Sequence, residues 1–456
     1  MLTDLVVVVP GIMGSALYRG GEALWDTTLG GIGNALKTLG ESIRSLALPD
    51  GIGDNPADDG VHAARLLRDV HVIPGLWTPI RGYNRLVERL ARIGFSEAKG
   101  NLLELPYDWR TSVRCIVDVE GPKIEAALAA WRAKDPANAD ARIVFIAHSM
   151  GGLVARRYAT THPDVGKIIT IATPHRGSVK ALQVLTQGVG PRWGWLQDVI
   201  LPLVTSLPSL HQLLPAYPCV DTDGKYQNFG DLKGQTVHGL DTTMAAAGIE
   251  FLDELAAAEA ADPRLTELLH SLIGWRQDTP ASLKLSGGKP VFQTSYGGLT
   301  LSGDGTVPHA GAVPKGMRLD SPVVHGFPDH HGNLQENSDL LNELVRILTE
   351  APPIVLRGDE TPASLNLPEL ILEGDDLAVD VSIPPESSEA IAVTLDPGTP
   401  DSEQRRPRLV DGEARVTFRN LTPGIHTVSI AGVTASSSLR PVTGTLTAWS
   451  RDWETG

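Results

Sequence analysis

RIVFIAHSMGGLVARRYATTH, residues 142–162, changes character at Ser149. Residues 143–147 form a continuous apolar run, which is typical of a strand buried on both faces of a parallel sheet. The residues after Gly152 favour a helix. A serine at so sharp a turn between a strand and a helix is typical of a nucleophile elbow. The strained backbone of such an elbow needs small residues two positions before and after the serine. Ala147 and Gly151 meet that need, although plain strand-to-helix turns also use small residues.

The same alternation of apolar strands and amphipathic helices continues to about residue 350. It predicts an α/β domain, residues 1–350, with a mostly parallel central sheet. The helical pattern of residues 83–95 stops at Gly94. Further buried strands are expected at residues 5–9, 167–172 and 322–325.

The pattern changes in the last hundred residues, where short alternating strands are separated by Pro, Gly and Asp. Residues 351–368 are interpreted as a linker and residues 369–456 as a small all-β domain, an immunoglobulin-like sandwich. Residues 351–456 hold 16 acidic residues, 8 arginines and no lysine. This acidic domain is expected to contact a protein partner rather than to carry chemistry.

Composition excludes several classes of function. The chain of 456 residues has a formal net charge of −15, which argues against nucleic acid as a partner. No apolar run reaches the ~18 residues of a membrane-spanning helix. The first apolar run contains Asp4 and ends at Pro10, so it predicts a strand rather than a signal peptide. With two cysteines and no disulfide framework, a cytoplasmic location is expected.

A nucleophilic serine needs hydrogen-bond donors for the oxyanion that forms on the substrate. The turn Pro10-Gly11 follows a buried strand, so the amide of Ile12 is one candidate donor, and the amide of Met150 is the second. A plain turn explains Pro10-Gly11 equally well on its own. His148 is interpreted as a packing residue of the elbow.

The acid and the base of such a site follow the serine in chain order. Asp304 lies in a glycine-flanked loop and is the candidate acid. His331, just before the last helical pattern of the α/β domain, is the preferred base. His325, which closes a strand, His330, which is expected to be solvated, and the more distant His309 stay open as alternatives. The remaining histidines show no metal-ligand spacing.

Five motifs occur in an order that resembles the lecithin:cholesterol acyltransferase-like family of α/β-hydrolases. No single motif is specific, but the ordered set is, and it covers about residues 1–350. The motifs are VPGIMGSAL (9–17), LPYDWR (105–110), AHSMGG (147–152), IATPHRGS (171–178) and GDGTVP (303–308).

The resemblance implies an α/β-hydrolase fold with Ser149, Asp304 and His331 as the catalytic triad. It also implies the amides of Ile12 and Met150 as the oxyanion hole. Two departures weigh against extracellular lipoprotein chemistry and a sterol acceptor: the lid-loop disulfide of secreted members has no counterpart, and the C-terminal β domain lies outside the family core.

The LPYDWR motif has two interpretations. The residues alone predict a packed strand end with an internal ion pair between Asp108 and Arg110. The resemblance offers a second role, in which Trp109 shapes the groove for the acyl chain of the substrate.

Two apolar inserts, near residues 24–50 and 179–235, do not fit the sheet pattern. One interpretation is a fixed cap over the core. The other is a lid that shields an acyl groove and moves at a lipid surface.

The segment 192–215 is the more apolar of the two inserts. Trp193 and Trp195 at its start are candidate substrate- or membrane-contacting residues. Pro202 and Pro208 exclude one long helix through the segment.

Together these features predict a serine lipase, phospholipase or O-acyltransferase that works through an acyl-enzyme on Ser149, without cofactor or metal. Glycerophospholipid is the first expectation for the substrate, with transient contact to a membrane surface. Neutral lipid is the second. A toxin or immune-effector role is an open speculation. The alternative from another class is a non-catalytic lipid- or protein-binding module on a hydrolase scaffold.

Overall fold

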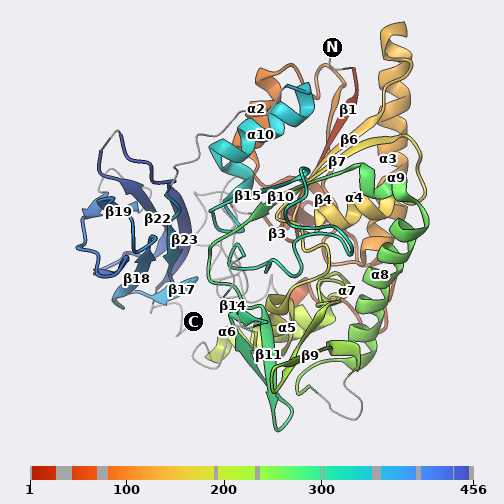
Figure 1. Ribbon diagram of the computed structural model, residues 1–456. Helices are drawn as coiled ribbons and strands as arrows, with labels where there is room; N and C mark the ends of the chain where they lie inside the picture. Colours follow the sequence, from red (N-terminus) through yellow and green to blue (C-terminus); the bar gives the residue numbers. More distant parts are fainter. Residues whose placement is uncertain are drawn as a thin grey trace.

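The computed structural model describes residues 3–26, 44–68, 81–188, 194–231, 237–297, 299–300, 303–351, 361–396, 402–434 and 436–450. A six-stranded parallel sheet crosses the N-terminal part in the order β15-β10-β7-β6-β1-β5 (Figure 1). The strands are β1 Leu5–Val9, β5 Leu102–Glu104, β6 Ile143–His148, β7 Val165–Ile171, β10 Leu269–Gly274 and β15 Val324–Phe327. The α/β class with a central parallel sheet is confirmed. Strand β15 begins two residues later than the pattern suggested.

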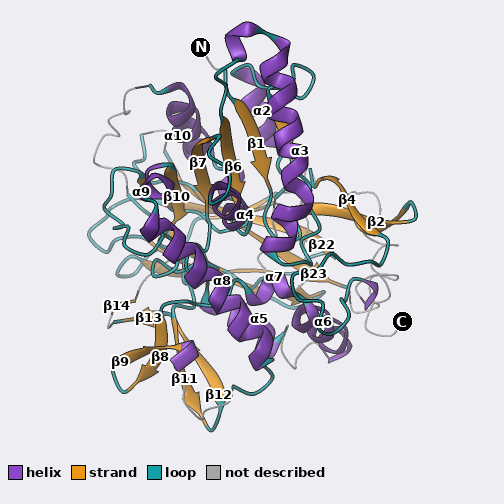
Figure 2. Cartoon of the chain, turned by 90° about the vertical axis from the view of Figure 1, so that its right-hand side faces the viewer, coloured by secondary structure: helices purple, strands orange, loops and turns teal. Residues whose placement is uncertain are grey.

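Alternate side chains of the central strands enter two different hydrophobic cores. In β1, Leu5, Val7 and Val9 belong to the first core, and Val6 and Val8 belong to the second. Burial on both faces explains why these strands are continuously apolar. The first core lies under α3 Val113–Lys134, α4 Gly151–Ala159, α5 Val179–Gln187, α6 Gly194–Ser206 and α8 Thr242–Ala261, and the second under α2 Asn84–Arg92 and α10 Ser338–Thr349 (Figure 2).

Local sequence explains where several helices begin and end. Helix α3 begins after Ser112, whose hydroxyl accepts a hydrogen bond from the amide of Cys115. Helix α10 begins after Asn337, whose side chain accepts from Asp339 and Leu340. After α2, Gly94 adopts a φ of +98°, which suits glycine and ends the helix as expected.

Smaller elements surround the central sheet. An antiparallel sheet has the order β3-β2-β4, and a mixed sheet has the order β12-β11-β8-β9. These strands are β2 Ser15–Arg19, β3 Glu22–Trp25, β4 Val61–Leu66, β8 Pro218–Thr222, β9 Lys225–Asn228, β11 Ser282–Ser286 and β12 Lys289–Gln293. The remaining elements of this part are the pair β13 Ser295–Tyr296 and β14 Leu299–Thr300, and the helices α7 Pro208–His211 and α9 Pro263–Glu267.

The described part of the second insert packs into the first core. Helix α6 continues through Pro202, and the break falls at Leu207, before Pro208. Pro202 therefore does not interrupt the helix, because burial of the neighbouring apolar side chains stabilises α6 despite one lost hydrogen bond. The buried side chains are Leu196, Val199, Ile200, Leu203 and Val204. This packing favours the fixed-cap interpretation for residues 194–214, and movement of a lid stays a prediction.

The first insert is described only at its ends. Residues 27–43, which include most of its expected helix, lie outside the described residues. Beyond them, Leu46 and Leu48 are buried in the first core.

The C-terminal part forms two sheets around a third hydrophobic core. One sheet has the order β16-β18-β21, and the other has the order β17-β23-β22-β19-β20. The strands are β16 Ser364–Asn366, β17 Leu370–Leu372, β18 Leu377–Ser382, β19 Ile391–Asp396, β20 Glu403–Arg405, β21 Glu413–Phe418, β22 Gly424–Gly432 and β23 Val442–Trp449. The all-β character agrees with the alternating pattern, and the immunoglobulin-like relationship stays a prediction.

The expected linker is partly wrong. Residues 364–366, inside the range 351–368, form β16, which pairs with β18. The sequence pattern does not indicate this strand, because it is only three residues long and lies in a polar, proline-rich stretch. The domain also contributes Leu370, Leu372 and Trp449 to the first core of the N-terminal part. The two parts are therefore packed together rather than only tethered.

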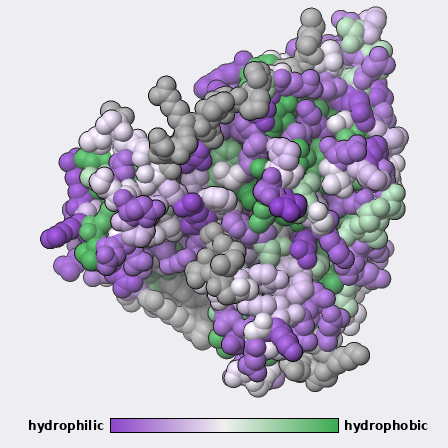
Figure 3. All heavy atoms as spheres, viewed as in Figure 1, coloured by the Kyte–Doolittle hydropathy of each residue, from purple (hydrophilic) through white to green (hydrophobic). Residues whose placement is uncertain are grey.

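No helix within the described ranges is long and apolar enough to cross a membrane. Cys115 and Cys219 are both buried and both free. On the face drawn in Figure 3, hydrophilic side chains cover much of the surface and apolar side chains lie in small patches between them.

Candidate active site

Ser149 occupies a strained turn between β6 and α4. Its φ is +52°, in the left-handed region that residues other than glycine rarely adopt. Its amide donates to the carbonyl of Ile171 over 2.8 Å. A β-carbon added to Gly151 would lie 2.4 Å from the carbonyl oxygen of Pro10, and one added to Gly152 would lie 2.0 Å from Oγ1 of Thr173. The small residues after Ser149 are thus required by close packing.

The structure brings Ser149, Asp304 and His331 together. Nε2 of His331 lies 2.9 Å from Oγ of Ser149, and Nδ1 of His331 lies 2.8 Å from Oδ2 of Asp304. All three side chains are buried, with exposed fractions of 1% or less. Asp304 comes from the loop after β14, and His331 from the loop after β15. Ser149 and His331, which are 182 residues apart in the chain, therefore meet at the carboxyl end of the central sheet.

The hydrogen bonds of the triad indicate which atoms carry a proton. The carboxylate of Asp304 accepts at Oδ1 from the amides of Thr306 (2.9 Å) and Val307 (2.7 Å). Its other oxygen accepts from Nδ1–H of His331, which leaves Nε2 free to accept the hydroxyl proton of Ser149. This arrangement can remove a proton from the serine and stabilise the imidazolium that results.

The other candidate histidines lie in different surroundings. Nε2 of His325 is 3.3 Å from the carboxylate of Glu343, and the ring of His309 packs beside Trp275. His330 is 9% exposed and binds the carbonyl of Leu365 over 2.7 Å. The expectation that His330 is solvated is therefore wrong, because strand β16 covers it.

The loop after β1 packs directly against the serine. A β-carbon on Gly11 would lie 3.0 Å from Cβ of Ser149. The hydroxyl of Tyr107 donates to the carbonyl of Pro10 over 2.7 Å and holds this loop. Within the described ranges, no hydrogen-bond acceptor is assigned to the amides of Ile12 and Met150. Both amides remain candidates for the oxyanion hole.

Tyr83 is a residue of this site that the sequence did not reveal. Its hydroxyl accepts from the amide of Gly11 (2.8 Å) and lies 3.0 Å from Nδ1 of His148. Nε2 of His148 lies 3.3 Å from the carbonyl of His331. Burial raises the pKa of Tyr83, so its hydroxyl keeps its proton. In the sequence, Tyr83 appears only as the start of a helical pattern, and no local signal connects it to residues 65 positions away.

Trp109, a candidate for substrate contact, is fully buried. Its Nε1 donates to the carbonyl of Ser15 over 3.1 Å, and its ring packs edge-on against Trp25. The neighbouring Arg110 forms ion pairs of 2.7 Å with Asp108 and 2.8 Å with Asp59. The LPYDWR segment thus has the packed, ion-paired form that the residues alone predicted.

Two further candidates for substrate contact are the tryptophans of the second insert, Trp193 and Trp195. Trp193 lies outside the described residues, and so does the side chain of Trp195.

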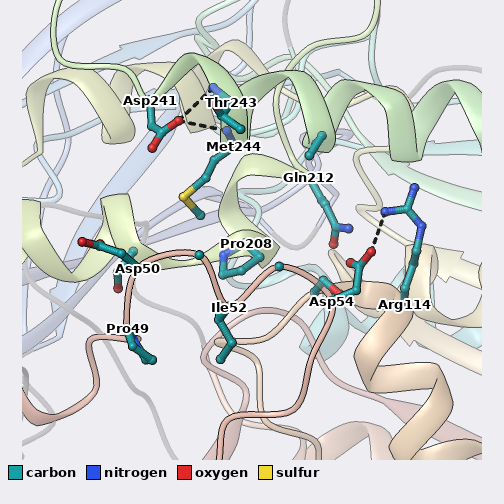
Figure 4. Close-up of a pocket in the computed structure, with 16 residues that line it drawn as sticks. Pro49, Asp50, Ile52, Asp54, Arg114, Pro208, Gln212, Asp241, Thr243 and Met244 are labelled. Carbon is teal, nitrogen blue, oxygen red and sulfur yellow. Dashed lines mark hydrogen bonds and ion pairs between the residues drawn. The ribbon is translucent and has the colours of Figure 1, made fainter.

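A separate cavity of about 230 Å³ lies between the loop of residues 49–54, the start of α3 and the start of α8 (Figure 4). None of its lining residues belongs to the triad or to the loop after β1. Arg114 at its rim is paired with Asp54 (3.3 Å) and Glu254 (2.6 Å), and Asp241 caps α8. In the described part of the chain, no cluster of three or more His, Cys, Asp or Glu side chains is placed to hold a metal ion.

Comparisons with known proteins give one family and distant structural neighbours. The family model of lecithin:cholesterol acyltransferase matches residues 57–238. No match was found among the curated proteins.

Two solved structures show limited similarity. One, described as "The crystal structure of Tle4-Tli4 complex", has a TM-score of 0.47 and 15% identity, and the match covers 77% of this chain and 99% of that chain. The other, "PKD domain of M14-like peptidase from Thermoplasmatales archaeon SCGC AB-540-F20", has a TM-score of 0.18 and 12% identity over 20% of this chain and 99% of that chain. These values are too low to bear on function.

The matched range contains Ser149, the LPYDWR segment and the IATPHRGS segment, whereas Asp304 and His331 lie beyond its end. For this part of the chain, the resemblance suspected from the ordered motifs is confirmed: residues 57–238 match the lecithin:cholesterol acyltransferase family.

Proposed function

We propose that this protein is a serine acyl-ester hydrolase or acyltransferase that acts on lipids. One observation carries the proposal: the continuous hydrogen-bonded chain from Oγ of Ser149 through His331 to Asp304, with the serine held at a φ of +52°. The family match supports a lipid acyl ester as the substrate. Glycerophospholipid is the preferred class.

The reaction proceeds in two steps. Oγ of Ser149 attacks the ester carbonyl carbon while its proton passes to Nε2 of His331. The amides of Ile12 and Met150 bind the oxyanion of the tetrahedral intermediate. The bond from carbon to the alcohol oxygen then breaks, and His331 returns the proton to the leaving alcohol. In the second step, the oxygen of water or of a lipid alcohol attacks the acyl carbon while His331 takes its proton. The bond from the acyl carbon to Oγ of Ser149 then breaks, and His331 returns the proton to Oγ.

Access to the serine requires a movement. Ser149 is 1% exposed, and a lipid ester must bring its carbonyl within bonding distance of Oγ. We therefore expect the residues that cover Ser149 to move when substrate binds, as lids do in many enzymes.

A mixed-lipid assay tests the proposal. The purified protein is incubated with vesicles that contain phosphatidylcholine, phosphatidylethanolamine, phosphatidylglycerol and diacylglycerol, and products are measured by mass spectrometry. Released fatty acid or a newly acylated alcohol is expected from the wild type and from Ser271→Ala, which removes another buried hydroxyl of the central sheet. Ser149→Ala should give neither. Turnover by Ser149→Ala equal to wild type would refute the proposal.

A further inference from the structure

Residue Leu365 of the C-terminal β domain bonds to two side chains that adjoin the candidate active site. Its amide donates to Oε1 of Gln277 over 3.0 Å, and its carbonyl accepts from Nε2 of His330 over 2.7 Å. Gln277 is fully buried, and His330 is 9% exposed. One residue of β16 therefore bonds to both Gln277 and His330.

Both side chains lie next to the acid and the base: His330 belongs to the loop of the base, and the segment of Gln277 pairs with the loop of the acid. The backbone of Gln277 exchanges hydrogen bonds of 3.0 and 3.1 Å with Gly303, the residue before Asp304. His330 is the residue before His331. The amide of His331 donates to the carbonyl of Asp304 over 2.8 Å, which joins the two loops. A shift of Leu365 would thus displace both Asp304 and His331.

Strand β23 makes a second contact, two residues to either side of His331. The amide of Thr443 donates to Oδ1 of Asp329 over 3.3 Å, and Nδ2 of Asn333 donates to the carbonyl of Thr443. Oδ1 of Asn333 accepts from the hydroxyl of Thr445 over 3.3 Å. The loop of His331 is therefore fixed at both ends by one strand of the C-terminal domain.

The approach of β23 to this loop is close. A β-carbon on Gly444 would lie 2.4 Å from Leu367 and 3.5 Å from the ring of His330. Asp329 is 4% exposed, and burial raises its pKa to about 6 although Asn337 and two amides donate to it. The oxygens of this buried carboxyl group join β23 to the start of α10.

Such contacts matter because proton transfer is sensitive to small displacements. A misplacement of 1 Å can cost about 100-fold in rate, and catalytic side chains on loops depend on their supporting contacts. The loops of Asp304 and His331 lie outside regular elements, so packing and hydrogen bonds must order them.

We propose that the C-terminal β domain is a positioning element for the candidate active site. Asn333, held by Thr443 and Thr445, and Gln277, held by Leu365, are positioning residues that fix His331 and Asp304. The inference rests on the proposed function for its kinetic readout but has a structural readout of its own.

Point variants in the full chain test this proposal. Thr445→Val and Gln277→Ala each remove one hydrogen bond to β23 or β16, and Asn333→Ala removes two to β23. Two variants serve as matched controls because they cut a domain contact elsewhere: Glu369→Gln and Lys180→Met each weaken the ion pair of 3.2 Å between Lys180 and Glu369. For each variant we would measure kcat and KM on a short soluble ester, the labelling rate with a fluorophosphonate, the melting temperature, and hydrogen exchange of residues 329–337.

We expect Asn333→Ala and Gln277→Ala to lower kcat and the labelling rate by about 10- to 100-fold, with KM within twofold of wild type. Thr445→Val should lower both by less, and combining it with Asn333→Ala should add little, because both changes break the same contact. Exchange at residues 329–337 should rise in Asn333→Ala. The two controls should keep wild-type kcat at similar melting temperatures.

Two results would overturn the proposal. The first is unaltered hydrogen exchange at residues 329–337 in Asn333→Ala, which tests positioning whether or not the protein hydrolyses esters. The second is a loss of kcat in the controls as large as in Asn333→Ala, which would indicate a general loss of stability. A wild type that is neither labelled nor active would refute the proposed function instead, while the exchange measurement still decides the positioning role.

Discussion

The hydroxyl of Tyr83 lies 3.0 Å from Nδ1 of His148, at the centre of a chain of hydrogen bonds beneath the candidate active site. The hydroxyl also accepts from the amide of Gly11. The carbonyl of His331 can only accept, so the neutral ring of His148 carries its proton on Nε2, and Nδ1 accepts from the hydroxyl of Tyr83. Nε2–H of His148 then donates to the carbonyl of His331. The loop that precedes Ile12 and the loop of His331 are therefore connected through two buried side chains.

Tyr83→Phe should reduce catalysis without unfolding the protein. The change leaves the amide of Gly11 without its acceptor and His148 without its donor, and a net loss of about 1.4 kcal/mol corresponds to tenfold. We expect kcat/KM on a short ester to fall about tenfold. Tyr158→Phe, which removes a buried hydroxyl on α4, is the control. Equal activity of both variants would show that the chain of hydrogen bonds is only structural.

Asp304→Asn should cost about 10⁴-fold in kcat, the loss known for the corresponding change in a serine triad. An amide at this position favours the wrong tautomer of His331. Asp278→Asn, at an exposed carboxylate in a neighbouring loop, should leave kcat within twofold of wild type. The assay is steady-state hydrolysis of a soluble ester at about pH 8. A loss below tenfold for Asp304→Asn would assign the orienting role to another group.

Acid should destabilise the fold partly through His270. Burial, with smaller effects of Lys167, His325 and Arg346, lowers the pKa of His270 to about 4. In the unfolded chain an imidazole titrates near about 6.5. The folded state therefore takes up this proton less readily, and the stability that the neutral ring contributes is present above pH ~6.5 and lost as the pH falls through about 4.

Removal of the titrating group tests this expectation. The melting temperature of His270→Gln should fall less than that of wild type between pH ~7 and pH ~4.5. An equal fall in both proteins would show that other groups cause the acid sensitivity.

The packing of Trp449 predicts that the two parts of the chain unfold together. Its side chain is 1% exposed and lies in the first core, so Trp449→Ala should cost about 3–5 kcal/mol in the free energy of unfolding. Trp275→Ala, at a ring that is 39% exposed, should cost less than about 1 kcal/mol. Chemical denaturation followed by circular dichroism measures both. A small effect of Trp449→Ala would show that this side chain does not couple the stability of the two parts.

The sequence patterns predicted those features that depend only on neighbouring residues, namely buried strands and the turn at Ser149. Strands β1, β6 and β7 were predictable because burial on both faces demands continuous apolar runs. Strand β15 was predicted two residues early, whereas β5 and β10 were not predicted. The elbow was predictable because its strained turn admits only small neighbours of Ser149. The order of the family motifs along the chain then identified Asp304 and His331 among the candidates for the acid and the base.

The contacts between distant segments were not predictable. Leu365 belongs to a strand of three residues within a polar stretch, and its bonds reach residues 35 and 88 positions away. Asn333 meets Thr443 across 110 positions. No spacing in one sequence encodes such pairs, so His330 was expected to be solvated and residues 364–366 to belong to a linker.

The nucleophilic role of Ser149 is the central claim, and mapping the adduct of a fluorophosphonate probe tests it most directly. The wild-type protein is treated with the probe and digested, and the modified residue is identified by tandem mass spectrometry. We predict one adduct, on Ser149, that is absent from Ser149→Ala and formed at least about 100-fold more slowly by His331→Ala. An unlabelled wild type, or an adduct that persists in Ser149→Ala, would contradict the account.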